Sequence, residues 1–148
     1  MTPKEFIYRY NRYANMVAVR YGVPSLVTLS QAAWESGWGR SAPKFNFFGM
    51  TAGSNYTGKK QFLSTFEYVN GQKVKVKRAF RAYDSPVQAF ADYAYNLANK
   101  PNYSEAFKYR RGNPEMFLKK VFEGGYATDP NYLTNTLKIM SMIKKYVS

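Results

Sequence analysis

Glu35 is the residue of this sequence best placed to do chemistry. It stands between Trp34 and Trp38, at the point where a predicted helix gives way to a loop. That loop has glycine at positions 37 and 39. Desolvation by the indoles and the negative end of the helix dipole would both raise the pKa of Glu35. A glutamic acid that stays protonated near neutral pH can act as a general acid. The alternative is an ordinary surface residue in the last turn of a helix.

The residue inventory excludes several kinds of enzyme. The 148 residues include 9 Asp and Glu but no histidine and no cysteine. Ser-His-Asp hydrolysis, cysteine peptidase chemistry and zinc sites built from His or Cys are therefore excluded. The groups that remain for acid–base catalysis are carboxylates, tyrosines, lysines and the backbone. Such catalysis needs no cofactor and no metal.

A second carboxylate, Glu67, lies in a predicted β-hairpin. Asn70 and Gly71 separate two β-prone runs, 61–69 and 72–83, and suit a two-residue type I′ turn. This turn pairs Glu67 with Val74 and Thr65 with Val76, which puts the carboxylate on the less polar face. The opposite face has Phe66, Tyr68, Lys73, Lys75 and Lys77. A cross-strand ion pair with a lysine is the structural alternative for Glu67, although this register places the lysines on the other face.

Helical patterns account for most of the remaining chain. Thr2 to Glu5 and Ser85 to Gln88 have the residue types of helix caps, each with proline at the first helical position. Residues 38–60 have no sustained period and predict a loop with a buried cluster of Phe45, Phe47 and Phe48. The predicted helices cover residues 2–21, 24–35, 85–99, 104–110, 114–123 and 129–146. We expect one domain over residues 1–148, of the α+β class and mainly α.

The formal net charge is +13, which favours an acidic partner such as nucleic acid, an anionic membrane surface or a wall polymer. The longest apolar runs are too short for stable membrane insertion. The first ten residues have no apolar segment of the kind found in a signal peptide, so we expect either that the protein is not exported by the Sec route as written or that a leader lies outside this sequence. The absence of cysteine does not distinguish a cytosolic from an extracellular chain.

Three ordered motifs indicate a family. Residues 31–39 read Gln-Ala-Ala-Trp-Glu-Ser-Gly-Trp-Gly, residues 46–50 read Asn-Phe-Phe-Gly-Met, and residues 125–132 read Gly-Tyr-Ala-Thr-Asp-Pro-Asn-Tyr. Together they resemble the bacterial glucosaminidase family, glycoside hydrolase family 73, which includes flagellar and autolysin peptidoglycan hydrolases. The predicted hairpin is similar to the β-lobe of that family. The resemblance implies a lysozyme-like helical fold with an inserted hairpin lobe.

The resemblance also implies roles for individual residues. Glu35 matches the general acid, Glu67 matches a second acidic residue proposed to activate water, and Tyr126 matches a tyrosine near the catalytic glutamate. The plain alternative for Tyr126 is core packing. The structural alternative for Asp129 is a helix N-cap, because it directly precedes Pro130.

A sugar polymer would need a binding surface beside these carboxylates. Trp38, Phe48, Tyr68 and Tyr83 are candidates to stack on saccharide rings. Asn46 is the candidate amide partner for an N-acetyl group, and Asp129 and Tyr132 extend the substrate-binding set.

The resulting hypothesis is an endo-β-N-acetylglucosaminidase that cleaves the β-1,4 bond after N-acetylglucosamine in peptidoglycan. The alternatives are a lytic transglycosylase or muramidase of the lysozyme-like superfamily, and a non-catalytic wall-binding module. Retaining, inverting and substrate-assisted routes all remain open. We expect a monomer with no nucleic-acid partner that acts at the bacterial cell wall, whether secreted, periplasmic or delivered by a phage.

Overall fold

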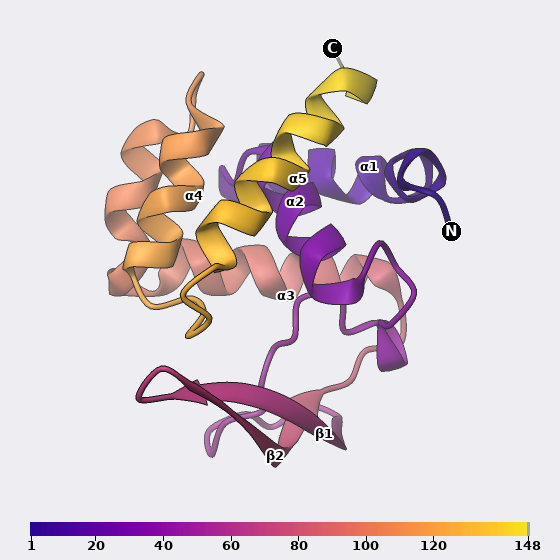
Figure 1. The fold of residues 1–148 in the computed structure, drawn as a ribbon. Coiled ribbons are helices and arrows are strands. Elements are labelled where there is room, and N and C mark those ends of the chain that lie inside the picture. Colours follow the sequence, from indigo (N-terminus) through magenta and orange to yellow (C-terminus); the bar gives the residue numbers. More distant parts are fainter. Residues whose placement is uncertain (148) are drawn as a thin grey trace.

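Helices form the upper part of the molecule in Figure 1, and a β-hairpin lies below them. The computed structural model describes residues 1–147. In chain order the elements are α1 (Pro3–Tyr21), α2 (Ser25–Ser36), the short 3-10 helix η1 (Pro43–Phe45), β1 (Lys60–Val69), β2 (Gln72–Arg81), α3 (Pro86–Asn99), the 3-10 helix η2 (Pro101–Tyr109), α4 (Pro114–Glu123) and α5 (Tyr132–Val147). The α+β, mainly α prediction is confirmed.

The predicted helix starts are present. The Thr2 side chain accepts from the N–H of Glu5 at 3.1 Å, and the Ser85 side chain accepts from the N–H of Gln88 at 3.4 Å. These bonds satisfy N–H groups that have no partner inside the helix. No helix among residues 1–147 has the length and apolar character needed to cross a membrane.

Three boundaries differ from the predictions. The segment 101–109 is a 3-10 helix, not an α-helix over 104–110, and β2 ends at Arg81. The last helix begins at Tyr132, later than the predicted start at Asp129, because the Asp129 side chain accepts from the N–H of Asn131 in a local turn. Such a side-chain bond offers the backbone an alternative to the helix.

The hairpin has the predicted register. Glu67 is paired with Val74 and Thr65 with Val76 in an antiparallel two-stranded sheet. Asn70 and Gly71 have φ values of 52° and 79°, as a type I′ turn requires. The register therefore fixes which side chains point toward the helices.

The core lies between the helices. Aromatic rings from α1, α3 and the loop after α2 pack together, among them Tyr10, Phe47 and Phe90. Phe47 and Phe48 are buried as predicted, but Phe45 is 40% exposed. Phe45 was predicted in the same cluster; it lies instead in η1 with a φ of 61°, which turns it away from the core.

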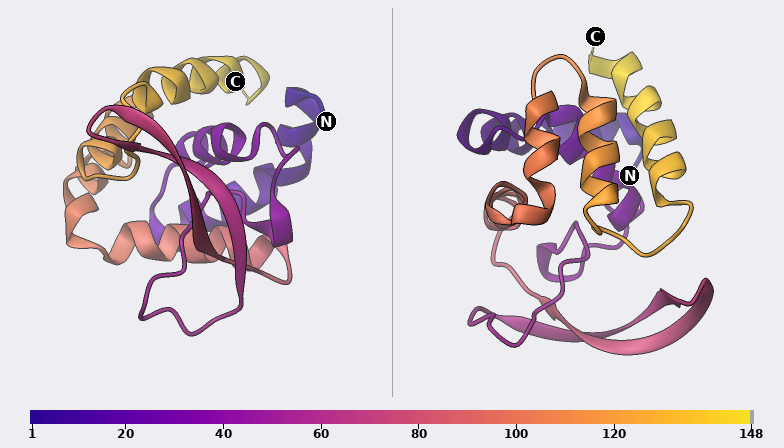
Figure 2. Two further views of the ribbon diagram at one scale, coloured as in Figure 1. Left: turned by 60° about the horizontal axis from the view of Figure 1, so that its bottom comes forward. Right: turned by 90° about the vertical axis from the view of Figure 1, so that its left-hand side faces the viewer.

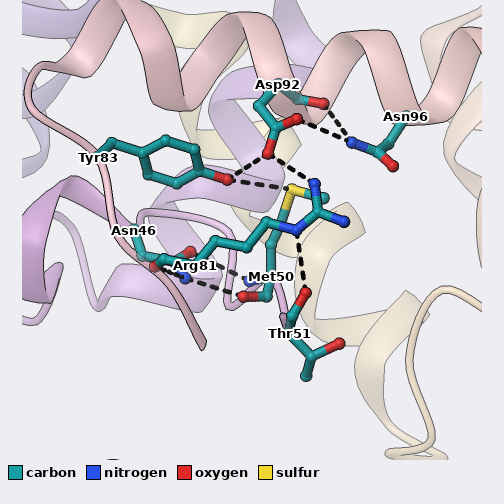
Figure 3. Close-up of polar contacts among 7 residues, drawn as sticks. All are labelled: Asn46, Met50, Thr51, Arg81, Tyr83, Asp92 and Asn96. Atoms are coloured by element: carbon teal, nitrogen blue, oxygen red, sulfur yellow. Dashed lines mark hydrogen bonds and ion pairs between the residues drawn. The ribbon is translucent and has the colours of Figure 1, made fainter. Parts of the chain in front are cut away.

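Two connections hold the hairpin against the helices. At its base, Arg81 contacts Asp92 of α3 at 2.8 Å (Figure 3). Near its tip, the N–H of Tyr68 donates to the hydroxyl of Thr128 in the α4–α5 loop at 3.4 Å. Figure 2 shows the hairpin passing across the helical face with its tip toward that loop. The hairpin is therefore anchored at both ends over the C-terminal end of α2.

Candidate active site

Glu35 lies in the last turn of α2, as predicted. Gly37 ends this helix in the left-handed conformation with a φ of 57°. The hydroxyl of Ser36 donates to the carbonyl of Ala32 at 2.6 Å and accepts from the N–H of Gly39 at 2.9 Å. These bonds fix the turn that follows α2 and so fix the position of the carboxyl group.

The Glu35 carboxyl group is desolvated. Burial raises the pKa of Glu35 from 4.5 to about 7, the Tyr132 hydroxyl opposes this rise by hydrogen bonding, and the charge of Asp129 adds to it. Burial disfavours the charged form of a carboxyl group, and a nearby negative charge does the same. A substantial fraction of Glu35 is therefore protonated at neutral pH.

The loop after η1 passes close to this carboxyl group. A Cβ atom at Gly49 would lie 3.1 Å from Glu35 Oε2, and Gly49 has a φ of +64°. Asn46 holds this loop in place. Its Nδ2 donates to the carbonyls of Met50 at 3.0 Å and Arg81 at 2.9 Å, and its Oδ1 accepts from the N–H of Met50 (Figure 3). Both amide protons are in use, so the prediction that Asn46 binds an N-acetyl group is corrected to a positioning role.

Tyr83 has a similar structural role. Its hydroxyl donates to Asp92 Oδ2 at 2.5 Å, beside the Arg81 guanidinium that contacts the same oxygen (Figure 3). Burial and the bond to Asp92 raise the pKa of Tyr83, so the phenol stays a donor. The prediction of Tyr83 as a sugar-stacking residue is corrected, because the ring belongs to the anchor between the hairpin and α3.

A cleft with a volume of about 430 Å³ separates the hairpin from the helices. Glu35, Tyr126 and Tyr132 contribute to its helical wall, while Thr65 and Glu67 contribute to its hairpin wall. The two candidate carboxylates therefore line one cleft from opposite sides.

Glu67 is paired with an arginine. Its Oε2 accepts from Arg78 Nη2 at 2.6 Å, and its Oε1 accepts from Arg78 Nε. The alternative of an ion pair with a lysine is wrong, because the partner of Glu67 is an arginine. Arg78 lies on the same strand face as Glu67, whereas Lys73, Lys75 and Lys77 lie on the other face, as the register predicted. This two-bond pairing holds the carboxylate in one orientation.

Tyr126 also borders the cleft. Its hydroxyl is buried and has no hydrogen-bond partner among residues 1–147, while its ring packs near those of Tyr93, Tyr103 and Tyr132. Burial raises the pKa of Tyr126 well above its ordinary value, and Glu35 contributes to that rise. Buried polar groups are normally paired, so an unpaired hydroxyl beside Glu35 is a feature that calls for a ligand or a water molecule.

The other predicted binding residues fall into two groups. Asp129 and Tyr68 line the cleft, and so does Tyr132, although its side chain is only 1% exposed. Trp38 and Phe48 do not line it. The Trp38 ring packs edge-on against Phe6 at 5.7 Å, and the Phe48 ring stacks on Tyr93 at 3.9 Å. Both predictions as stacking platforms are corrected to packing roles.

Trp34 occupies the place predicted for Trp38. It is 37% exposed and lines the cleft beside Glu35, together with Phe66, which is 57% exposed. The positive φ of 59° at Trp38 reverses the chain after the helix and turns that indole toward the core. No group of three or more Asp and Glu side chains in the described chain is arranged to hold a metal ion.

Comparison with known proteins identifies a family and several relatives of this chain. The family model described as "Mannosyl-glycoprotein endo-beta-N-acetylglucosaminidase" matches residues 11–147. The peptidoglycan hydrolase FlgJ of Escherichia coli (strain K12) is 36% identical over 155 residues, covering 98% of this chain and 49% of FlgJ. A probable N-acetylmuramidase of Lactococcus lactis is 36% identical over 137 residues, covering 86% of this chain and 30% of that protein. The chain thus spans about half or less of the length of these relatives.

A solved structure has the same fold. The crystal structure of a peptidoglycan hydrolase mutant from Sphingomonas sp. A1 superposes with a TM-score of 0.88 at 36% sequence identity, covering 97% of both chains. The family match includes the helix end that bears Glu35, the hairpin that bears Glu67 and the loop that bears Tyr126. The chain belongs to the glucosaminidase family of glycoside hydrolases.

Proposed function

We propose that this chain is a peptidoglycan hydrolase, an endo-β-N-acetylglucosaminidase that uses Glu35 as its general acid. The observation that carries the proposal is a glutamic acid with a pKa raised to about 7 by burial at the edge of an open cleft. A protonated carboxyl group there can give its proton to the glycosidic oxygen as the bond to the anomeric carbon breaks. The leaving sugar then departs as an alcohol.

Glu67 is proposed as the second carboxylate of the reaction. It lines the cleft opposite Glu35, from the hairpin wall, and both of its oxygens accept hydrogen bonds from Arg78. These bonds hold the carboxylate against Arg78 and leave it less able to orient an attacking water molecule. Glu67 is thus better suited to stabilise the positive charge that develops at the anomeric carbon than to deprotonate water. Attack by the acetamido oxygen of the substrate itself is compatible with that role.

Tyr126 is proposed as a hydrogen-bond donor to the reacting sugar. Its buried hydroxyl has no hydrogen-bond partner among residues 1–147, and the residue borders the cleft together with Glu35. Because its pKa is raised, the hydroxyl keeps its proton throughout the working pH range. It can therefore donate to an acetamido oxygen or to a bound water without competing with Glu35 as an acid.

Sugar binding is assigned to aromatic side chains along the cleft. Trp34 lines it beside Glu35 and is 37% exposed, so the CH side of a saccharide ring can pack on its indole. Phe66 and Tyr68 border the cleft from the hairpin face opposite Glu67. Lys73 lines the same cleft and offers a cation to the carboxylates of peptide stems or lactyl groups. With a net charge of +13, the chain is suited to a polyanionic wall, where we propose that it acts as a monomer.

The position of the cleaved bond separates this proposal from its nearest rivals. FlgJ is named a peptidoglycan hydrolase, and the Lactococcus lactis relative is named a probable N-acetylmuramidase. A muramidase would leave reducing N-acetylmuramic acid, and a lytic transglycosylase would leave anhydro-muramic ends. The proposed glucosaminidase leaves reducing N-acetylglucosamine.

The decisive test compares Glu35→Gln with Glu67→Gln in wall-lysis zymograms and in sedimentation binding to purified peptidoglycan. Glutamine is nearly isosteric but cannot give up a proton as a carboxylic acid does. We expect Glu35→Gln to lose on the order of 10²- to 10⁴-fold in activity while it still binds the wall. Glu67→Gln should lose less, because its role is electrostatic.

A different outcome would change the assignment. Full lysis by Glu35→Gln would refute its role as the acid. If the unmodified protein sediments with the wall but never lyses it, the non-catalytic binding module becomes the correct reading. Equal loss in both variants would favour a mechanism in which Glu67 handles a proton.

A further inference from the structure

A row of buried polar side chains lies behind Glu35. Gln31, one helical turn before Glu35 in α2, is 0% exposed, and Tyr93 of α3 and Tyr132 of α5 are each 1% exposed. The Tyr93 hydroxyl donates to Gln31 Oε1, and Gln31 Nε2 donates to the Tyr132 hydroxyl at 3.0 Å. Three helices therefore meet in one hydrogen-bonded chain that ends beside the candidate acid.

The bonds of this chain share one direction, from Tyr93 through Gln31 to Tyr132. A carbonyl oxygen can only accept, so the bond from Tyr93 orients the Gln31 amide with its nitrogen toward Tyr132. The Tyr132 oxygen accepts that N–H, which leaves its own proton free for another partner. Glu35, one helical turn after Gln31, lines the same cleft wall as Tyr132, and Tyr132 opposes the rise that burial causes in its pKa, which makes the Glu35 carboxyl group the candidate partner.

We propose that Gln31 is a positioning residue that holds the Tyr132 hydroxyl as a donor to one oxygen of Glu35, so that the acid proton resides on the other oxygen. A carboxyl oxygen that accepts a hydrogen bond from Tyr132 is not the one that carries the proton. The proton is thereby directed to the oxygen available to a substrate in the cleft. This inference rests on the proposed role of Glu35 as the general acid.

The arrangement has a second consequence for the acid. A donor to the carboxyl group stabilises its ionised form, and Tyr132 accordingly opposes the rise that burial causes in the pKa of Glu35. Without Gln31, the Tyr132 hydroxyl has no fixed orientation and its proton is no longer committed to Glu35. Loss of Gln31 should therefore raise the pKa of Glu35 further and misplace its proton.

The experiment compares Gln31→Met with Ser30→Ala in the intact chain. Methionine has a similar length but cannot donate to Tyr132. Ser30 is the matched control, because it is 0% exposed on the same helix and its hydroxyl bonds only to the Leu26 carbonyl at 2.5 Å. The readouts are the pH profile of kcat/KM, the titration of Glu35 followed by NMR of ¹³C-labelled glutamate, and the melting temperature.

We expect Gln31→Met to move the Glu35 titration and the alkaline limb of the pH profile upward, and to lower kcat on the order of tenfold to a hundredfold. Ser30→Ala should lower the melting temperature and leave both pH readouts in place. Tyr93→Phe, which frees the Gln31 amide to flip, should shift the titration in the same direction by a smaller amount. Gln31→Glu, which can donate to Tyr132 while protonated, should recover activity at low pH.

An unchanged Glu35 titration in folded Gln31→Met would overturn the inference, since a purely structural role lowers stability without moving that titration. The NMR readout does not depend on catalysis. Should Glu35→Gln keep its lytic activity, the proposed function would fail, yet a shifted titration in Gln31→Met would still support the positioning role.

Discussion

Replacing Glu35 by glutamine should stabilise the folded protein at alkaline pH and have little effect in acid. The reason is the cost of ionising a buried carboxyl group, whose pKa rises from 4.5 to about 7 on folding. Between these values the folded state binds more protons than the unfolded state. The contribution of Glu35 to the free energy of unfolding is therefore highest below pH 4.5, falls as the pH rises toward 7 and levels off above it. Glutamine does not titrate and removes this loss.

The size of the effect follows from the shift. One pKa unit corresponds to about 1.4 kcal/mol, so the shift of Glu35 from 4.5 to about 7 corresponds to roughly 3.5 kcal/mol as an upper limit. In a chain of this length, that amount raises the melting temperature by roughly 7 to 14 °C. We expect the difference between Glu35→Gln and the unmodified chain to approach this size at pH 8.5 and to vanish near pH 4.

The assay is urea or thermal unfolding of both proteins at pH 4, 5.5, 7 and 8.5. Glu105→Gln is the control, because Glu105 is an exposed carboxylate paired only with Lys108 at 3.1 Å. It should give a nearly constant difference over the series. The reasoning would be refuted if Glu35→Gln also gave a constant difference, or if it destabilised the protein at pH 8.5.

Three further predictions concern the surroundings of Glu35. Gly49→Ala places a Cβ atom 3.1 Å from the Glu35 carboxyl group, so it should shift the pH–activity profile. Gly112→Ala is the control, because Gly112 has a φ of +81° and open space around it. This control should lower the melting temperature and leave the pH–activity profile unchanged. Asp92→Asn weakens the bonds to the hairpin base and should lower the melting temperature by several degrees, as measured by circular dichroism. Trp34→Ala removes a cleft-lining indole and should raise KM for soluble wall fragments more than it lowers kcat; an unchanged KM would contradict its binding role.

Local sequence signals predicted the parts of the site that depend on neighbouring residues. The end of α2 at Gly37 and the turn at Asn70 and Gly71 each follow from the left-handed conformation that these residues tolerate. Those two turns placed Glu35 at a helix end and Glu67 on the correct face of its strand. Both therefore could be named before any tertiary contact was known.

The interpretation of the two tryptophans shows where local reasoning stops. Trp34 precedes Glu35 directly and Trp38 follows it by three residues, but only Trp34 reaches the cleft. The chain reversal after Gly37 decides between them, and its outcome depends on how Trp38 packs against Phe6 of α1. Residue type alone gives no means of separating a platform from a core contact.

Long-range contacts could not be predicted from the local sequence pattern. Gln31 meets Tyr93 and Tyr132 across separations of 62 and 101 residues, and these contacts exist only because three helices pack together. Arg78 was not predicted as the partner of Glu67, although the predicted register already put Arg78 on the same strand face.

The reducing ends released from purified peptidoglycan test the proposed function most directly. The measurement is borohydride reduction of the soluble products followed by mass spectrometry. The proposal predicts that reduced N-acetylglucosamine accumulates with the unmodified chain and is absent with Glu35→Gln. Reduced N-acetylmuramic acid, anhydro-muramic ends, or undiminished product from Glu35→Gln would contradict it.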